Sequence, residues 1–140
     1  MSEEILAGPV NVTDRAHALG WKTTGLTVRA HLIPDEDASP YDDGFSPIQA
    51  SGWLRGMWWY VGLVVTVTDA YGFDWSTDSL FSVVRGWWTS TDENGVVTGE
   101  RWLDPLTEDD PLNEVIGTAL RNAVQRIKSF IPPKIMEPSA

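Results

Sequence analysis

The chain has 140 residues, enough for one domain with a sizeable apolar core, and it contains no cysteine. The lack of cysteine excludes disulfides, zinc-thiolate sites and thiol catalysis. Its net charge of −10 is the opposite of the positive surface that binds phosphates, so we expect no direct contact with nucleic acid.

The acidic excess lies in the first 110 residues, which carry 18 Asp and Glu against six Lys and Arg. Solubility is its simplest explanation, because net charge keeps proteins apart in solution. The alternative interpretation is an acidic surface that competes with nucleic acid for a basic protein. The start of the chain lacks the basic region of a signal peptide, and the longest apolar run is shorter than the ~20 residues that span a bilayer. We therefore expect a cytoplasmic protein without membrane contact.

The first part of the chain predicts a loose arm, a short helix and a strand. Residues 1–10 show no clear pattern and are expected to be flexible. Thr13 is a plausible cap for a helix that ends before Gly20. Residues 21–33 alternate between apolar and polar side chains, which is typical of a half-buried strand. Its apolar face would carry Leu26, Val28, Ala30 and Leu32.

A second helix and a long central strand follow. Residues 34–45 form a turn-rich acidic loop, after which Ser46 and Pro47 fit the start of a short helix over 47–55. Residues 57–68 predict a strand whose neighbouring side chains point to opposite faces. One face would be apolar throughout, with Trp59, Val61, Leu63, Val65 and Val67. The other face would be mixed, with Trp58, Tyr60, Gly62, Val64, Thr66 and Thr68.

The rest of the chain predicts a hairpin and a long helix. Residues 69–75 are too few for a parallel crossover, so a strand over about 77–88 should pair antiparallel with the central strand. Asn94-Gly95 is a two-residue hairpin signal that would turn residues 87–91 back along 96–102. From Leu112 to Ile131 the apolar residues gather on one half of a helical wheel, with Asp110 and Pro111 at its start.

These elements predict an α+β fold. An antiparallel sheet of three to four strands would carry the C-terminal amphipathic helix on one face, and a short helix would precede the central strand. Residues 1–140 would form a single domain with an ordered core over about 12–131. Flexible arms would cover 1–10 and 132–140.

We find no catalytic motif and expect no metal, no cofactor and no enzymatic activity. The two histidines, His17 and His31, do not form a metal-binding motif. Asp74 and Asp78 are the nearest approach to an acid–base pair. The loop carboxylates lack the spacing of a calcium-binding loop: Asp35, Glu36, Asp37, Asp42 and Asp43.

The aromatic doublets Trp58-Trp59 and Trp87-Trp88 are the best functional lead. If a helix covers one face of the sheet, one tryptophan of each pair must lie on the other face. Exposed apolar patches usually mark interfaces. The alternative is that the helix at 47–55, the N-terminal segment or the hairpin covers that face. The candidate interface consists of Trp58, Tyr60, Trp87 and Trp88 with the acidic residues Asp35, Glu36, Asp37, Asp42 and Asp43.

The run from Trp53 to Thr68, with Trp58-x-Tyr60-Val61-Gly62 at its centre, followed by Asp78-Ser79-Leu80, resembles small uncharacterised proteins of actinobacteria and their phages. The order of elements matches over about residues 21–130. After Leu80 those proteins tend to continue Trp-Gly, whereas this chain continues with Phe81 and has an added Asn94-Gly95 segment. The resemblance implies a phage or mobile-element origin and transfers no catalytic residue.

Two functions remain open at this point. The first is a non-enzymatic phage or mobile-element accessory protein that acts by protein–protein contact, in a homodimer or with a host protein. A specific version is an acidic inhibitor that mimics nucleic acid and occupies a basic site. The alternative is a small-ligand-binding protein or enzyme that uses a crevice lined by Trp and Asp between sheet and helix.

Overall fold

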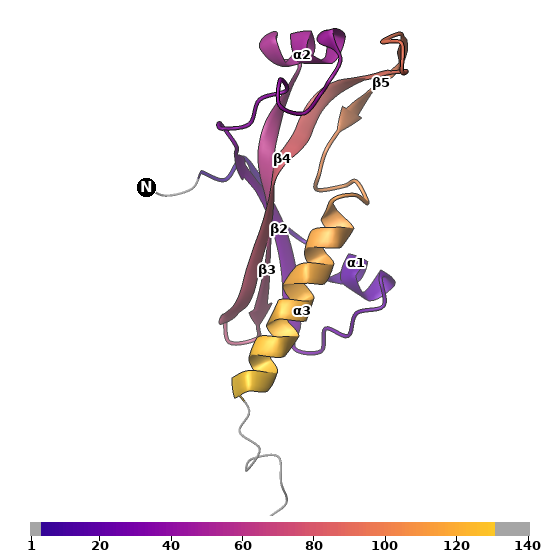
Figure 1. Ribbon diagram of the computed structural model, residues 1–140. Helices are drawn as coiled ribbons and strands as arrows, with labels where there is room; N and C mark the ends of the chain where they lie inside the picture. The colour runs from indigo at the N-terminus through magenta and orange to yellow at the C-terminus, as the bar shows by residue number, and fades with distance from the viewer. Residues whose placement is uncertain (1–3, 131–140) are drawn as a thin grey trace, which may run out of the picture.

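The computed structural model describes residues 4–130, which fold as one antiparallel sheet with a long helix along one face and a short helix at its upper end (Figure 1). The sheet has five strands that lie side by side in chain order: β1 (Ala7–Asn11), β2 (Leu26–Pro34), β3 (Trp58–Asp69), β4 (Asp74–Thr91) and β5 (Val97–Leu103). The helices are α1 (Thr13–Ala18), α2 (Pro47–Leu54) and α3 (Leu112–Phe130). The predicted α+β class is confirmed, but the prediction of three to four strands was too low.

The additional strand is β1, in the segment that was expected to be flexible. It pairs antiparallel with β2, with Val10 opposite Ala30 and Asn11 opposite Arg29. The Leu6 N–H extends this edge by donating to the Leu32 carbonyl at 2.8 Å. Most side chains of β1 are exposed, so backbone pairing rather than an apolar pattern holds the strand. Residues 1–3 and 131–140, which include the predicted C-terminal arm and Ile131, lie outside the described residues.

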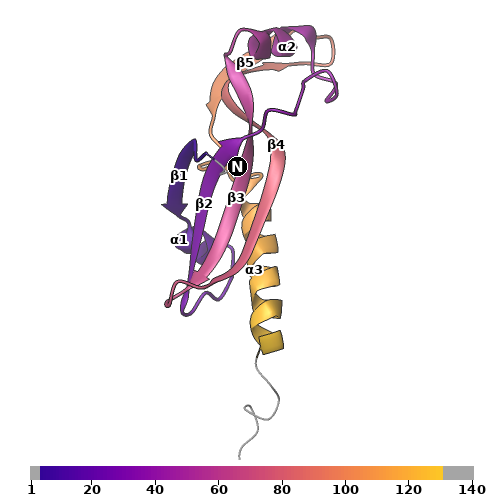
Figure 2. The same ribbon diagram turned by 90° about the vertical axis from the view of Figure 1, so that its left-hand side faces the viewer.

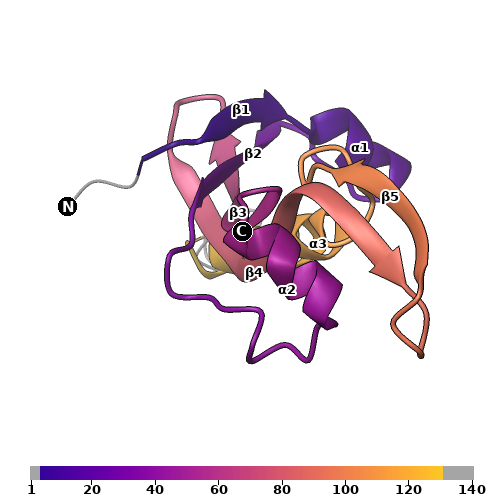
Figure 3. The same ribbon diagram turned by 90° about the horizontal axis from the view of Figure 1, so that it is seen from above.

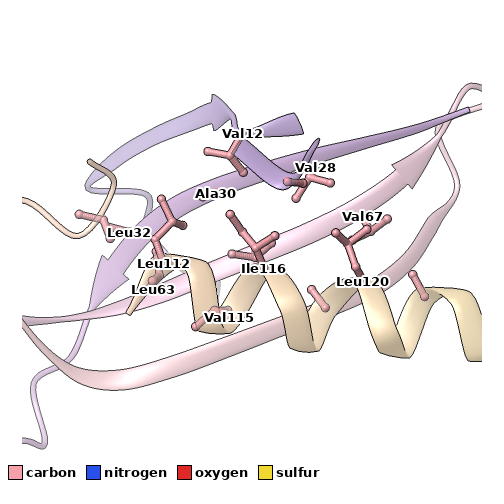
Figure 4. Close-up of a cluster of buried hydrophobic side chains, with 14 of the residues drawn as sticks. Val12, Val28, Ala30, Leu32, Leu63, Val67, Leu112, Val115, Ile116 and Leu120 are labelled. Atoms are coloured by element: carbon pink, nitrogen blue, oxygen red, sulfur yellow. The ribbon is translucent and has the colours of Figure 1, made fainter. Parts of the chain in front are cut away.

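α3 lies along one face of the sheet (Figure 2), and the apolar core fills the space between them (Figure 4). The predicted apolar faces are buried there: Val28, Ala30 and Leu32 on β2, and Val61, Leu63, Val65 and Val67 on β3. Ile116 and Leu120 of α3 are fully buried against them. Each such side chain stabilises the fold by about 1.5–3 kcal/mol. The apolar stripe ends before Phe130, which is 61% exposed.

β3 and β4 pair antiparallel, as predicted. Asp69 organises the short connection between them. The Asp69 carboxylate accepts hydrogen bonds from the backbone N–H groups of Phe73 (3.1 Å) and Tyr71 (2.9 Å). The Trp75 indole N–H adds a third bond at 3.0 Å. These donors, the Phe73 N–H foremost, lower the pKa of Asp69 because they stabilise its charged form.

Two predictions of local geometry need correction. Val12, not Thr13, occupies the cap of α1, where the Asn11 side chain accepts from the Thr13 N–H at 2.9 Å. The Thr13 hydroxyl instead accepts from the Val28 N–H at 3.0 Å and ties α1 to β2. The turn at Asn94-Gly95 does join two strands, but it is longer than two residues. Gly95 donates to the Asp92 carbonyl, with Gly95 in the left-handed region at φ 79°.

The upper half of the molecule is built from α2 and the β4–β5 hairpin. β4 runs from Asp74 to Thr91, so the predicted strand over about 77–88 and the predicted hairpin arm over 87–91 form one continuous strand that begins three residues earlier than expected. β2 ends opposite Val61, so residues 58–60 of β3 pair with β4 alone. Seen from above, the hairpin curves past α2 (Figure 3).

Candidate functional site

Two of the predicted interface residues, Trp58 and Tyr60, lie in the interior. They are only 1% and 4% exposed, because α2 and the acidic loop cover this end of the sheet. The Trp58 indole N–H donates to the Gln49 carbonyl of α2 at 2.9 Å. The rings of Phe45 and Trp88 pack edge-on against Trp58 at 5.8 and 5.2 Å between centroids. The expectation of an exposed patch at Trp58 and Tyr60 was therefore wrong, and the alternative of cover by the second helix holds.

Tyr60 joins this interior to the acidic loop. Its hydroxyl donates to the Asp43 carboxylate at 2.5 Å. Burial, and then this bond to Asp43, raise the pKa of Tyr60 far above its usual value, and the nearby charges of Asp35 and Asp42 act in the same direction. The phenol is thus neutral at physiological pH and serves as a hydrogen-bond donor.

The five loop carboxylates divide into two groups. Asp35 accepts from the Ser82 N–H at 2.6 Å and Asp43 accepts from Tyr60, so both hold the loop against the sheet. The side chains of Glu36, Asp37 and Asp42 have no hydrogen-bond or ion-pair partner among residues 4–130, and all three are exposed. These three carboxylates have no internal contact within the described residues, whereas Asp35 and Asp43 also anchor the loop.

A cluster of three tryptophans lies on the opposite side of the sheet from Trp58. Trp87 of β4 is paired directly with Trp102 of β5, and their ring centroids are 5.7 Å apart. Trp59 of β3 lies 6.2 Å from Trp102. Trp87 is 52% and Trp102 is 44% exposed, while Trp59 is partly buried against the core. We call Trp59, Trp87 and Trp102 the three-tryptophan cluster.

This cluster is exposed because α3 does not reach it. The helix begins at Leu112 and runs toward the lower end of the sheet, away from the β4–β5 hairpin (Figure 1). Trp87 was among the predicted interface residues, and it remains accessible; Trp88 is half-buried between Phe45 and Trp58. Trp102 was missed as a surface candidate, whereas Trp59, which was predicted on the apolar face, is partly buried against the core. The Asn94-Gly95 turn could have identified Trp102, because a hairpin centred on this turn pairs Trp102 with Trp87.

A groove of about 260 Å³ adjoins the cluster between α2 and the β4–β5 hairpin. Ile48 and Met57, which are 41% and 44% exposed, form its apolar rim together with Trp87. Arg55 and Glu100 add one charge of each sign. The chemistry that this surface offers is apolar contact and ring stacking, without an arranged nucleophile or base.

The described part of the chain contains no group of three or more His, Asp and Glu side chains placed to hold a metal ion. Asp74 accepts from the Thr68 hydroxyl at 2.8 Å, and the His17 ring is hydrogen-bonded to the Thr23 hydroxyl. The space between sheet and α3 is filled by the core side chains (Figure 4). Core side chains therefore occupy this position, and a hollow lined by Trp53, Trp59 and Asp35 lies instead between the sheet and α2.

Within residues 4–130 no helix is both long enough and apolar enough to cross a membrane. Comparison of the chain with protein-family models, curated proteins and solved structures gives no match.

Proposed function

We propose that this protein is a non-enzymatic binding protein that contacts a protein partner through the three-tryptophan cluster. The observation that carries the proposal is the exposure of Trp87 and Trp102, paired across neighbouring strands at the end of the sheet that α3 leaves open. Tryptophan is enriched among the residues that dominate binding energy at interfaces. A rigid strand pair also presents the two rings with little loss of conformational entropy on binding.

The adjoining groove supports the same proposal. Ile48 and Met57 extend the apolar surface from Trp87 onto α2. Isolated exposed apolar residues are ordinary, but a contiguous group on two elements is typical of an interaction site. The origin in a phage or mobile element, implied by the resemblance of residues 53–80, remains a prediction, as does the cytoplasmic compartment.

The acidic-inhibitor version is a narrower proposal about the partner. It draws support from Glu36, Asp37 and Asp42, whose carboxylates are exposed and unpaired within the described residues. A partner held by these charges would have a basic surface, and its binding would weaken with salt. Without that salt dependence the protein would still be a binding protein, but not a nucleic-acid mimic.

The test is affinity capture with the tagged full chain from nuclease-treated actinobacterial lysate, repeated with Trp87→Ala and Trp102→Ala. Tyr71→Ala is the matched control, because Tyr71 is an aromatic residue 96% exposed in the β3–β4 connection. We expect a partner that binds the parent and the control but is lost with both tryptophan variants, and that binds again as a purified protein. A set of captured proteins that does not change with either tryptophan variant would contradict the proposal.

A further inference from the structure

We propose that the hollow at the free edge of β3 binds a basic side chain, arginine or lysine, of the partner polypeptide. The inference rests on the proposed function, since it assigns a chemical class to the partner of the same surface. It depends on aromatic walls and carboxylates that meet around one cavity of about 350 Å³.

The hollow exists because β2 is shorter than β3. β2 ends at Pro34, opposite Val61, and the chain turns away there into the acidic loop. The edge of β3 at residues 58–60 is therefore left beside the loop and α2. The cavity is lined by Leu6, Pro34, Asp35, Glu36, Ala38, Trp53, Trp59 and Tyr60.

Its walls are suited to a cation with an aliphatic stem. Trp53 from α2 and Trp59 from β3 are both half-buried, so part of each ring faces the cavity. Tyr41 packs edge-on against Trp53 at 6.1 Å and holds that ring in place. An ammonium or guanidinium group over a tryptophan face is attracted by the ring quadrupole, and its methylene stem packs on the same surface.

The charges at the hollow have one sign only. Asp35 and Glu36 line it, and no Lys, Arg or His is among its lining residues. Tyr60, which also lines the hollow, donates its hydroxyl to Asp43. A basic side chain would thus meet carboxylates in the hollow, while Arg85, opposite Trp59 on β4, lies 4.0 Å from Asp104.

A second hollow favours a polypeptide over a single small cation. This cavity of about 450 Å³ lies beside the same segment and shares Pro34, Asp35, Glu36 and Ala38 with the first. It adds Asp37 and the ring of Phe81, which is 48% exposed. Two adjoining acidic hollows, each with an aromatic wall, match an extended segment with two basic side chains. Trp59 also packs against Trp102, so this edge is continuous with the three-tryptophan cluster.

The experiment is a titration of the full chain, labelled with ¹⁵N, with a blocked Gly-Arg-Gly-Arg-Gly peptide. The indole N–H signals of Trp53 and Trp59 report on the cavity, and Trp→Phe variants assign them. The same peptide with citrulline in place of arginine keeps the shape of the side chain and removes its charge.

Free arginine amide at equal side-chain concentration tests whether a small cation binds as well as the peptide. Glu36→Gln removes one lining carboxylate, and Glu93→Gln removes a carboxylate in the β4–β5 turn, outside both hollows.

We expect the arginine peptide to move both indole signals and the citrulline peptide to leave them in place. Glu36→Gln should weaken peptide binding by about three- to tenfold, and Glu93→Gln should leave it unchanged. Equal binding of the citrulline peptide, an equal loss with Glu93→Gln, or no binding would overturn the inference. If arginine amide binds as tightly as the peptide, the inference that the occupant is a polypeptide would be overturned. None of these results depends on Trp87 or Trp102, so failure here is separate from failure of the proposed function.

Discussion

At the scale of single residues, Gly86 decides how closely β4 approaches β3. It lies opposite Trp58 with φ 123°, a conformation that side chains rarely adopt. A Cβ at this position would lie 2.6 Å from the Met57 carbonyl oxygen and 2.7 Å from the Trp58 Cα. These are backbone atoms of the neighbouring strand and cannot rotate away. Glycine is therefore required for the buried position of Trp58.

Gly86→Ala should lower the free energy of unfolding by about 3 kcal/mol or more, from the strained φ and the backbone clash together. Gly95→Ala is the matched control, because Gly95 also has a positive φ but opens onto empty space. It should lose about 1 kcal/mol, from the left-handed conformation alone. Urea denaturation followed by tryptophan fluorescence measures both. Equal losses at the two positions would show that the close contact at Gly86 does not constrain the strand.

Tyr60 links stability to alkaline pH. Its pKa in the folded state lies above the value of about 10 that an unfolded chain gives. The stabilisation is therefore complete below pH about 10 and is lost as the pH rises through the folded-state pKa. The free energy of unfolding should fall less steeply above pH 10 in Tyr60→Phe than in the parent. Tyr71→Phe, at a fully exposed phenol, should follow the parent; a parallel fall in all three proteins would contradict this assignment.

At the scale of elements, α3 is the main source of the core. Its residues Leu112, Ile116 and Leu120 recur at helical spacing, and all three are completely buried. The Ser76 hydroxyl of β4 donates to the Ala119 carbonyl at 2.6 Å and fixes the helix along the sheet. The position of α3 thus depends on one apolar stripe and a small number of polar contacts.

Leu120→Asp should unfold the protein, because it places an unpaired charge between α3 and the sheet. We expect a loss of about 4 kcal/mol or more. Gln125→Asp introduces the same carboxylate on the exposed face of the helix and should cost less than about 1 kcal/mol. Thermal melting followed by circular dichroism compares them. A Leu120→Asp variant that melts at the temperature of the parent would show that α3 does not pack as described.

At the scale of the whole molecule, the covering helices decide which tryptophans are core and which are surface. α2 and the acidic loop cover Trp58. α3 begins at Leu112 and runs away from the β4–β5 hairpin, so it does not cover Trp87. Trp58→Ala should therefore cost about 3–5 kcal/mol of stability. Trp87→Ala, on an exposed site, should cost much less while removing part of the proposed contact surface. Melting of both variants checks this; a larger loss for Trp87→Ala would reverse the assignment of the two faces.

The net charge of −10 makes a second prediction at this scale. If the partner is basic, raising the salt from about 50 mM to about 500 mM should weaken its binding, because the screening length falls from roughly 14 Å to roughly 4 Å. The effect should appear mainly as slower association. Surface plasmon resonance with the purified partner measures both rate constants. An affinity that is the same at both concentrations would leave the charge a solubility feature and remove the acidic-inhibitor version.

The sequence by itself determined the elements whose signals are local. The alternation in β2 and β3, Ser46-Pro47 before α2 and the apolar stripe of α3 all depend on neighbours a few residues apart. Only the tertiary structure revealed β1, because an exposed edge strand is held by backbone bonds that leave no side-chain pattern. It also decided that Trp58 is core and that Trp59, Trp87 and Trp102 form a surface. Alternation assigns two tryptophans to opposite faces, but which face is covered depends on where a distant helix begins and ends.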